Sequence, residues 1–190
     1  MTHHPVEATA FQQALRGCIL QLRQQPRTAL AALFDLTAQR LVRYASTLAG
    51  NQSDAEDALQ AVFSLLARDP RCLTAAQSPW PYLIRSIRNE TLRILRKKSR
   101  NSSLTHDPTA GNTSASTPSQ QLLDAEITQQ VRRILLSLPP EQSEVVLLKH
   151  WEELTFAEIA ESLNLSQNTV ASRYRYALEK LQRSLEPFIR

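Results

Sequence analysis

Glycine, cysteine and methionine are scarce in this chain of 190 residues, which contains only three glycines, two cysteines and one methionine. Few glycines, with many Leu, Ala, Gln, Glu and Arg residues, favour helices over strands. Cys18 and Cys72 lie far apart and outside any CxxC or Cys/His group. A disulfide is possible, but two reduced thiols in a cytoplasmic protein fit better, and we expect no metal site.

Long apolar runs are also missing, so we expect no membrane insertion. The N-terminal segment MTHHPVEATA lacks the basic-then-apolar layout of a secretion signal. Paired carboxylates and His or Cys groups at catalytic spacing are not found either. We therefore expect no enzyme activity and no cofactor.

Acidic residues are few in the first half of the chain. Residues 1–100 carry 14 Lys and Arg against 7 Asp and Glu, whereas residues 122–190 carry 8 against 10. A basic excess concentrated in one part of the chain suits a polyanionic partner better than a generally soluble surface.

One segment has almost nothing to bury. Residues 101–119 contain nine Ser and Thr, two prolines and a single leucine. Such a segment cannot offset the entropy lost on ordering, so it reads as a flexible linker. We predict an all-α chain of two small helical domains, residues 1–100 and 122–190, joined by a linker at 101–121.

Apolar residues recur with helical spacing on both sides of this linker, and no segment alternates with a period of two. Capping boxes are expected where Ser53 precedes Glu56 and where Thr155 precedes Glu158. The expected helices span residues 11–24, 28–48, 53–69, 81–98, 122–138, 141–151, 155–163 and 167–185.

The segment from Thr155 to Leu181 has the pattern of a helix-turn-helix. Two helices return apolar residues to one core across a turn of three residues. Asn164 in the turn tolerates the left-handed conformation, and the small Ala160 allows close approach. The expected core consists of Phe156, Ile159, Ala160, Leu163, Val170, Tyr174, Ala177, Leu178 and Leu181.

This arrangement projects the first turns of the second helix outward. Polar side chains there can meet base edges and phosphates in a major groove, and the helix N-terminus favours a phosphate. The alternative is a helical hairpin that only packs and has a solvated polar face. Capping, turn length and core spacing favour DNA binding, with candidate contacts at Gln167, Asn168, Thr169, Ser172, Arg173 and Tyr176.

Basic residues gather on one side of the helix expected near residues 81–100. Seven of these twenty residues are basic and only Glu90 is acidic. Like charges destabilise a surface unless an anion compensates them, so a solvated face is the weaker reading. Trp80 and Tyr82 either stack on unpaired bases or pack in the core. The candidate contacts are Trp80, Tyr82, Arg85, Arg88, Asn89, Arg93, Arg96, Lys97 and Arg100.

The third expected helix opens with acidic residues. Acids in a first turn complement the helix dipole, which accounts for them without any partner. However, the same polar side continues beyond the first turn, which leaves a partner-binding face open. The candidate residues of this face are Asp54, Asp57, Gln60 and Ser64.

Over nearly its full length the chain resembles the two-domain sigma factors of extracytoplasmic-function (ECF) type, in the sigma-70 superfamily. DAEDALQAVFSLLAR resembles the helix that docks on the polymerase clamp, and PYLIRSIRNETLRILRKKSR resembles the helix that reads and helps open the minus-ten element. The C-terminal stretch LPPEQSEVVLLKHWEELTFAEIAESLNLSQNTVASRYRYALEKLQ is similar to the domain that reads the minus-thirty-five element.

The resemblance implies roles for individual residues. Polymerase would contact Asp54, Asp57 and Gln60. The upstream part of the minus-ten element would face Asn89, Arg96, Lys97 and Arg100, while the loop at 71–79 would hold a flipped base. The minus-thirty-five major groove would receive Gln167, Asn168, Thr169, Ser172 and Arg173.

Four positions depart from the family pattern. Tyr82 stands where tryptophan is usual, Arg93 where aspartate is, Ala171 where lysine is, and Tyr176 where arginine is. The lost cations should weaken phosphate contact, and Arg175 should restore some of it. These differences affect the expected promoter sequence more than the function.

The resemblance implies binding to core RNA polymerase and promoter DNA, with promoter recognition, DNA melting and transcription initiation as the function. We see no attached sensor domain, so an anti-sigma factor or transcriptional control is the expected regulation, and we expect a monomer when free. The alternative is a dimeric helix-turn-helix regulator whose N-terminal domain senses or dimerises. A sensor, however, does not need the basic helix.

Overall fold

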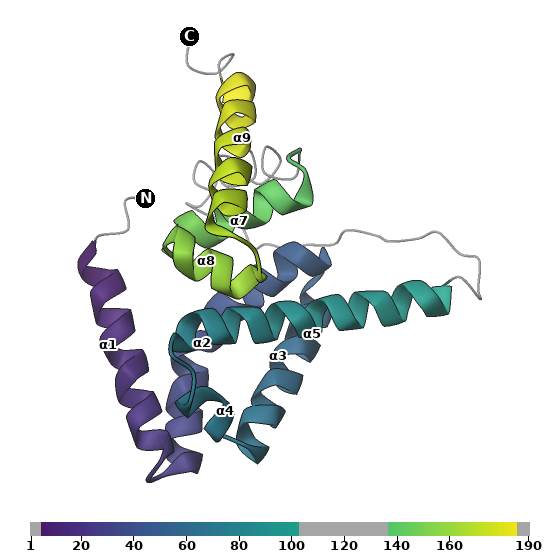
Figure 1. Cartoon of the computed structure of the whole chain (residues 1–190). Coiled ribbons are helices and arrows are strands. Elements are labelled where there is room, and N and C mark those ends of the chain that lie inside the picture. The colour runs from purple at the N-terminus through teal and green to yellow at the C-terminus, as the bar shows by residue number, and fades with distance from the viewer. Residues whose placement is uncertain (1–4, 103–136, 186–190) are drawn as a thin grey trace, which may run out of the picture. The chain divides into compact units, whose positions relative to one another are not determined.

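The computed structural model describes residues 5–102 and 137–185, and the regular elements in these ranges are all helices. The chain divides into two compact units, Met1–Thr109 and Ala110–Arg190 (Figure 1). The predicted all-α class is confirmed. The division falls inside the predicted linker. Residues 101–102 belong to a helix. The rest of the predicted linker, and most of the helix expected at 122–138, fall within residues 103–136, which lie outside the described residues.

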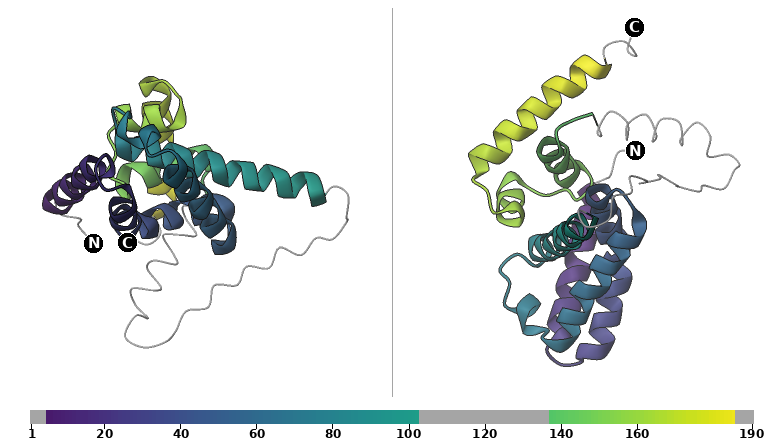
Figure 2. Two further views of the ribbon diagram at one scale, coloured as in Figure 1. Left: turned by 90° about the horizontal axis from the view of Figure 1, so that it is seen from below. Right: turned by 90° about the vertical axis from the view of Figure 1, so that its right-hand side faces the viewer.

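Within residues 5–102, the first unit has five helices. They are α1 (Pro5–Leu22), α2 (Pro26–Ala49), α3 (Gln52–Arg68), the short α4 (Arg71–Thr74) and α5 (Pro79–Ser102). The helices α1, α2 and α3 run alongside one another, and α5 crosses them (Figures 1 and 2). Because α2 packs against α1, α3 and α5, it lies at the centre of the unit.

The joint between α2 and α3 is only two residues long. Gly50 adopts the left-handed conformation, with φ of 76°, and its backbone N–H donates to the Ser46 carbonyl at 2.9 Å. Asn51 then caps α3, since its side-chain oxygen accepts from the backbone N–H of Asp54 at 2.9 Å. The capping box predicted for Ser53 and Glu56 is therefore wrong: the cap lies two residues earlier.

A continuous apolar core fills the first unit. Its two buried threonines are satisfied locally, as the hydroxyls of Thr37 and Thr91 donate to the carbonyls of Leu33 and Ile87 at 2.7 and 2.8 Å. The largest fully buried side chains of this unit are Leu15, Leu33, Leu41, Leu66, Leu73, Trp80, Leu83, Ile84 and Ile87.

The second unit contains α7 (Pro140–His150), α8 (Phe156–Leu163) and α9 (Gln167–Leu185). Both halves of the predicted capping box at Thr155 and Glu158 are present, and Asn164 adopts the left-handed conformation with φ of 56°. These features confirm the predicted helix-turn-helix, formed by α8 and α9. One expected core residue is misplaced, since Leu178 is 42% exposed.

Candidate nucleic-acid and protein interfaces

The first turn of α9 carries exposed polar side chains held in place by a local cap. The Ser166 hydroxyl accepts from the Thr169 backbone N–H at 3.1 Å and lies 2.8 Å from the Thr169 hydroxyl. Gln167 and Asn168 are exposed beside it. The predicted contact residues therefore stand at a capped helix N-terminus, where backbone N–H groups and polar side chains can meet an anion together.

Further along α9, the predicted contacts differ in how free they are. Ser172 is half-buried, and its hydroxyl donates to the Thr169 carbonyl at 2.9 Å. Arg173 pairs with Glu141 of α7 at 3.2 Å. Tyr176 is 48% exposed, and the Arg175 guanidinium lies 5.1 Å from the centre of its ring. Between the departures from the family pattern at 171 and 176, α9 still carries two arginines, Arg173 and Arg175.

An aromatic cluster that sequence reasoning did not single out braces α9. The Tyr174 ring stacks on His150 of α7 at 5.7 Å and meets the Phe156 edge at 5.4 Å. The Tyr174 hydroxyl lies 2.8 Å from His150 Nε2. Burial of part of the imidazole and the nearby charge of Lys149 lower the pKa of His150. Tyr174 therefore locks α9 against both α7 and α8.

The outward side of α5 is basic, as the sequence predicts. Arg93 is paired within the helix, because its Nε donates to the Glu90 carboxylate at 2.9 Å. Arg88 is half-buried. The remaining predicted contacts on this side are exposed, namely Arg85, Asn89, Arg96, Lys97 and Arg100.

Trp80 lies in the core and not on the surface. It is 1% exposed, its ring meets Phe11 of α1 edge-on at 4.9 Å, and the Arg40 guanidinium lies over both rings at 4.1 and 5.3 Å. The core-packing alternative for Trp80 therefore describes this structure, because the ring is covered by α1 and α2 and cannot stack on a base in this conformation.

Tyr82 is half-buried beside the segment predicted as a base-holding loop. That segment is partly helical, since α4 spans Arg71–Thr74. Asp69 organises its start: one carboxylate oxygen accepts from the Arg71 backbone N–H at 3.1 Å and the other accepts from the Cys72 thiol at 3.6 Å. Burial raises the pKa of the Tyr82 phenol, and nearby Cys72 and Asp69 raise it further.

On α3, the four predicted polymerase contacts separate into two groups. Asp57 and Gln60 are exposed and Ser64 is half-buried, so all three are accessible. Asp54 is 2% exposed and pairs with Lys98 of α5 at 2.5 Å. Its assignment to an exposed face does not fit this structure, because the first turn of α3 directs this carboxylate inward to α5.

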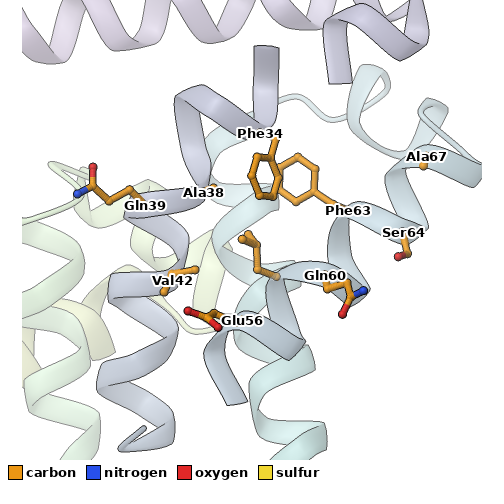
Figure 3. Close-up of a pocket in the computed structure, with 10 residues that line it drawn as sticks. Phe34, Ala38, Gln39, Val42, Glu56, Gln60, Phe63, Ser64 and Ala67 are labelled. Carbon is orange, nitrogen blue, oxygen red and sulfur yellow. The ribbon is translucent and has the colours of Figure 1, made fainter. Parts of the chain in front are cut away.

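Gln60 and Ser64 border a groove between α2 and α3 (Figure 3). The groove has a volume of about 670 Å³, and the rings of Phe34 and Phe63 meet edge-on in its wall at 5.0 Å. The Phe34 side chain is 42% exposed in this wall. An apolar groove edged by polar groups is suited to a helical protein partner.

Within residues 5–102 and 137–185, no three His, Cys, Asp or Glu side chains gather in a way that could hold a metal ion. Among the helices described, none combines the length and apolar character needed to cross a membrane.

Comparison with known proteins places both units in one family. Residues 33–101 match the model of sigma-70 region 2, and residues 128–181 match the model of sigma-70 region 4. The ECF RNA polymerase sigma factor SigW of Bacillus subtilis is 27% identical over 186 residues, covering 92% of this chain and 98% of that protein. SigL of Mycobacterium tuberculosis, also an ECF sigma factor, is 26% identical, covering 83% and 89%.

A solved structure has the same fold. The sigma factor RpoE of Bartonella quintana, crystallised in complex with the anti-sigma factor NepR, aligns with a TM-score of 0.62. The alignment covers 80% of this chain and 94% of that chain, at 21% sequence identity.

Proposed function

We propose that this chain, which belongs to the sigma-70 family of RNA polymerase sigma factors and is of the ECF type, uses separate surfaces to bind polymerase and the two promoter elements. As a sigma factor it binds core RNA polymerase and directs promoter recognition and transcription initiation. The exposed start of α9 reads the minus-thirty-five element, the basic side of α5 holds the minus-ten element, and α3 with its groove docks on polymerase.

The assignment of α9 rests on its capped N-terminus. Gln167 and Asn168 project from the first turn, where hydrogen-bonding side chains reach base edges in a major groove. Arg173 lies about one and a half turns further along, in position to add a bidentate contact. The bracing of Tyr174 by His150 and Phe156 holds this helix in a fixed orientation.

The observation that carries the proposal is the exposed basic side of α5. Melting a promoter exposes single-stranded phosphates, and exposed Arg96 and Lys97 offer cations to them. Base flipping costs a few kcal/mol, which these contacts offset. The mechanism is differential binding to melted DNA and needs no covalent chemistry, so the chain is not an enzyme in this proposal.

The groove between α2 and α3 is the proposed polymerase site. Phe34 and Phe63 supply an aromatic wall, and Gln60 and Ser64 supply polar groups at its edge. A central apolar anchor with a polar rim is the usual anatomy of a specific protein interface. Asp57 and Gln60 keep the role proposed from the sequence, whereas buried Asp54 does not.

Regulation by an anti-sigma factor belongs to the same proposal, supported by the fold shared with a sigma factor crystallised with one. The chain acts in the cytoplasm, where polymerase and DNA meet, and is a monomer when free. The earlier alternative, a dimeric regulator with a sensor domain, loses its basis because the first unit matches sigma-70 region 2.

Reconstitution with core polymerase tests the function. The chain and core enzyme, mixed with a genomic promoter library, should yield run-off transcripts. The start sites of these transcripts should lie downstream of a shared pair of promoter elements. Core enzyme alone is the control. Failure to initiate at every promoter of the library would contradict the proposal.

A further inference from the structure

Lys98 lies on a different side of α5 from the other basic residues near its end. At about 100° per residue, Lys98 is rotated about 140° from Arg93, toward the side of Thr91 and Ile94. Thr91 is fully buried and Ile94 half-buried, so this side packs against the rest of the unit. One of the seven basic residues of α5 therefore lies on its packed side, although its side chain stays largely exposed.

The partner of Lys98 is a buried carboxylate on another helix. Lys98 Nζ donates to Asp54 Oδ1 at 2.5 Å, and Asn51 donates to the second Asp54 oxygen at 3.0 Å. Burial alone would raise the pKa of this carboxyl, but the bonds from Lys98 and Asn51 and the Lys98 charge lower it. Asp54 is therefore an anion, fixed at the first turn of α3.

The pair joins the helices where the apolar packing of α5 ends. Residues 96–100 are all exposed, whereas Ile87 and Thr91, two to three turns earlier, are fully buried. The last turns of α5 carry the proposed minus-ten contacts Arg96 and Lys97. The direction of these turns is then set in part by an ion pair.

We infer that Asp54 is a positioning residue for minus-ten recognition: by holding Lys98, it fixes the basic end of α5 at a set angle to the polymerase-binding helix α3. The inference rests on the function proposed for α5. In this role the Lys98 ammonium pairs with Asp54, whereas the ammonium of its neighbour Lys97 contacts the DNA.

A contrasting role for Lys98 is direct contact with a phosphate. Its side chain is 63% exposed, so a phosphate could reach it. The two roles differ in their coupling. If Lys98 acts through Asp54, removing both side chains lowers the affinity for DNA no more than removing one. If Lys98 contacts a phosphate directly, its removal lowers the affinity further, in addition to the effect of removing Asp54.

The test uses holoenzyme assembled from core polymerase and the full chain. The variants are Asp54→Asn, Lys98→Met, their double variant and Lys98→Arg. Lys97→Met, alone and combined with Asp54→Asn, is the matched control. Three affinities are measured for each: for core polymerase, for a fork-junction DNA with a single-stranded minus-ten element, and for a minus-thirty-five duplex. Helicity and melting temperature establish that each variant is folded.

We expect Asp54→Asn and Lys98→Met each to weaken fork-junction binding about tenfold, and the double variant to be no weaker than either. Lys98→Arg should stay within about twofold of wild type, because it keeps the ion pair. Lys97→Met combined with Asp54→Asn should show multiplied losses. Affinities for core polymerase and the minus-thirty-five duplex should change less than about twofold, which a general loss of structure would not allow.

Other results overturn the inference. Fork-junction binding by Asp54→Asn within twofold of wild type would remove Asp54 from the role, and multiplied losses in the double variant would assign Lys98 to the DNA. If Lys98→Met does not fold, the double variant, which leaves no lone buried charge, decides the matter. Wild-type holoenzyme that bound no fork junction would overturn the proposed function itself.

Discussion

The guanidinium of Arg173 lies 3.2 Å from the carboxylate of Glu141, so the first turn of α7 holds an arginine of the recognition helix. The side chains are 26% and 69% exposed, and an ion pair this open to water contributes little to folding. Under the proposed function, the pair orients Arg173 before DNA binds. Glu141 also places a negative charge beside the proposed DNA surface.

Substitutions at this pair should separate affinity from specificity. Arg173→Ala should cost about 1–3 kcal/mol of affinity for a matched minus-thirty-five duplex, as expected for a bidentate base contact. Glu141→Gln should bind scrambled duplex more tightly, because a charge that repels phosphate is gone, and so discriminate less. Fluorescence anisotropy with matched and scrambled duplexes measures both. Arg183→Ala, on the last turns of α9, is the control; equal losses for Arg183 and Arg173 would exclude a base contact.

The basic side of α5 predicts a defect in promoter opening. Alanine at both Arg96 and Lys97 should reduce open-complex formation while leaving core binding intact, because both side chains are exposed and away from the groove. Permanganate footprinting reports the opening, and competition with wild type reports core binding. Alanine at Arg16 and Arg27, both exposed on other helices, removes the same charge. Loss of core binding in the Arg96 and Lys97 variant would show that this side is misassigned.

The groove predicts a loss of polymerase affinity without a large loss of stability. Phe34→Ala should weaken core binding about tenfold, since aromatic anchors dominate interface energies. The side chain is 42% exposed, so the melting temperature should fall only slightly. Leu65→Ala is the matched control, because Leu65 is 49% exposed on α3 and outside the groove lining. Indistinguishable affinities for the two variants would argue against the groove as the docking site.

The Asp54–Lys98 pair predicts an unusual stability order. Lys98→Met should destabilise the chain by about 1–3 kcal/mol. The buried Asp54 carboxylate would lose the cation and keep the hydrogen bond from Asn51. Adding Asp54→Asn should recover much of this loss, since the charge that needed compensation is gone. Urea denaturation followed by circular dichroism gives the order. A double variant less stable than Lys98→Met would contradict it.

The same pair makes stability depend on pH in the acidic range. The pKa of Asp54 is lowered in the folded state, so the folded protein binds its proton less readily than the unfolded chain. The stability from the pair is then fully present above the unfolded carboxyl pKa, about 4, and is lost as pH falls through the folded pKa. The stability difference between wild type and Asp54→Asn should shrink between pH 5 and the acid limit of folding, at about pH 2–3. A constant difference would mean that Asp54 does not titrate with folding.

Features governed by neighbours in the sequence were predictable. The capping box at Thr155, the left-handed Asn164 and the one-sided charge of α5 need only a few adjacent residues, and all three are present. The family resemblance, carried by motifs of local character, is confirmed as well.

Features governed by distant partners were not predictable. Asp54 and Lys98 are separated by 44 positions, so only the packing of α3 on α5 reveals that both belong to one pair. Trp80 shares its surroundings with Phe11 and Arg40, which arrive from two other helices. Helical periodicity identifies an apolar side, but it does not distinguish a side that is covered from one that lines a groove, as Phe34 does.

The joint at Gly50 and Asn51 fixes the proposed polymerase-binding groove before binding. One residue closes α2 in the left-handed conformation and the next opens α3 with its cap, so the two helices form a stiff hairpin. The walls of the groove therefore stand in place before any partner arrives. If polymerase docks here as proposed, the speed of recognition is governed by diffusion and charge and not by a folding step of the sigma factor.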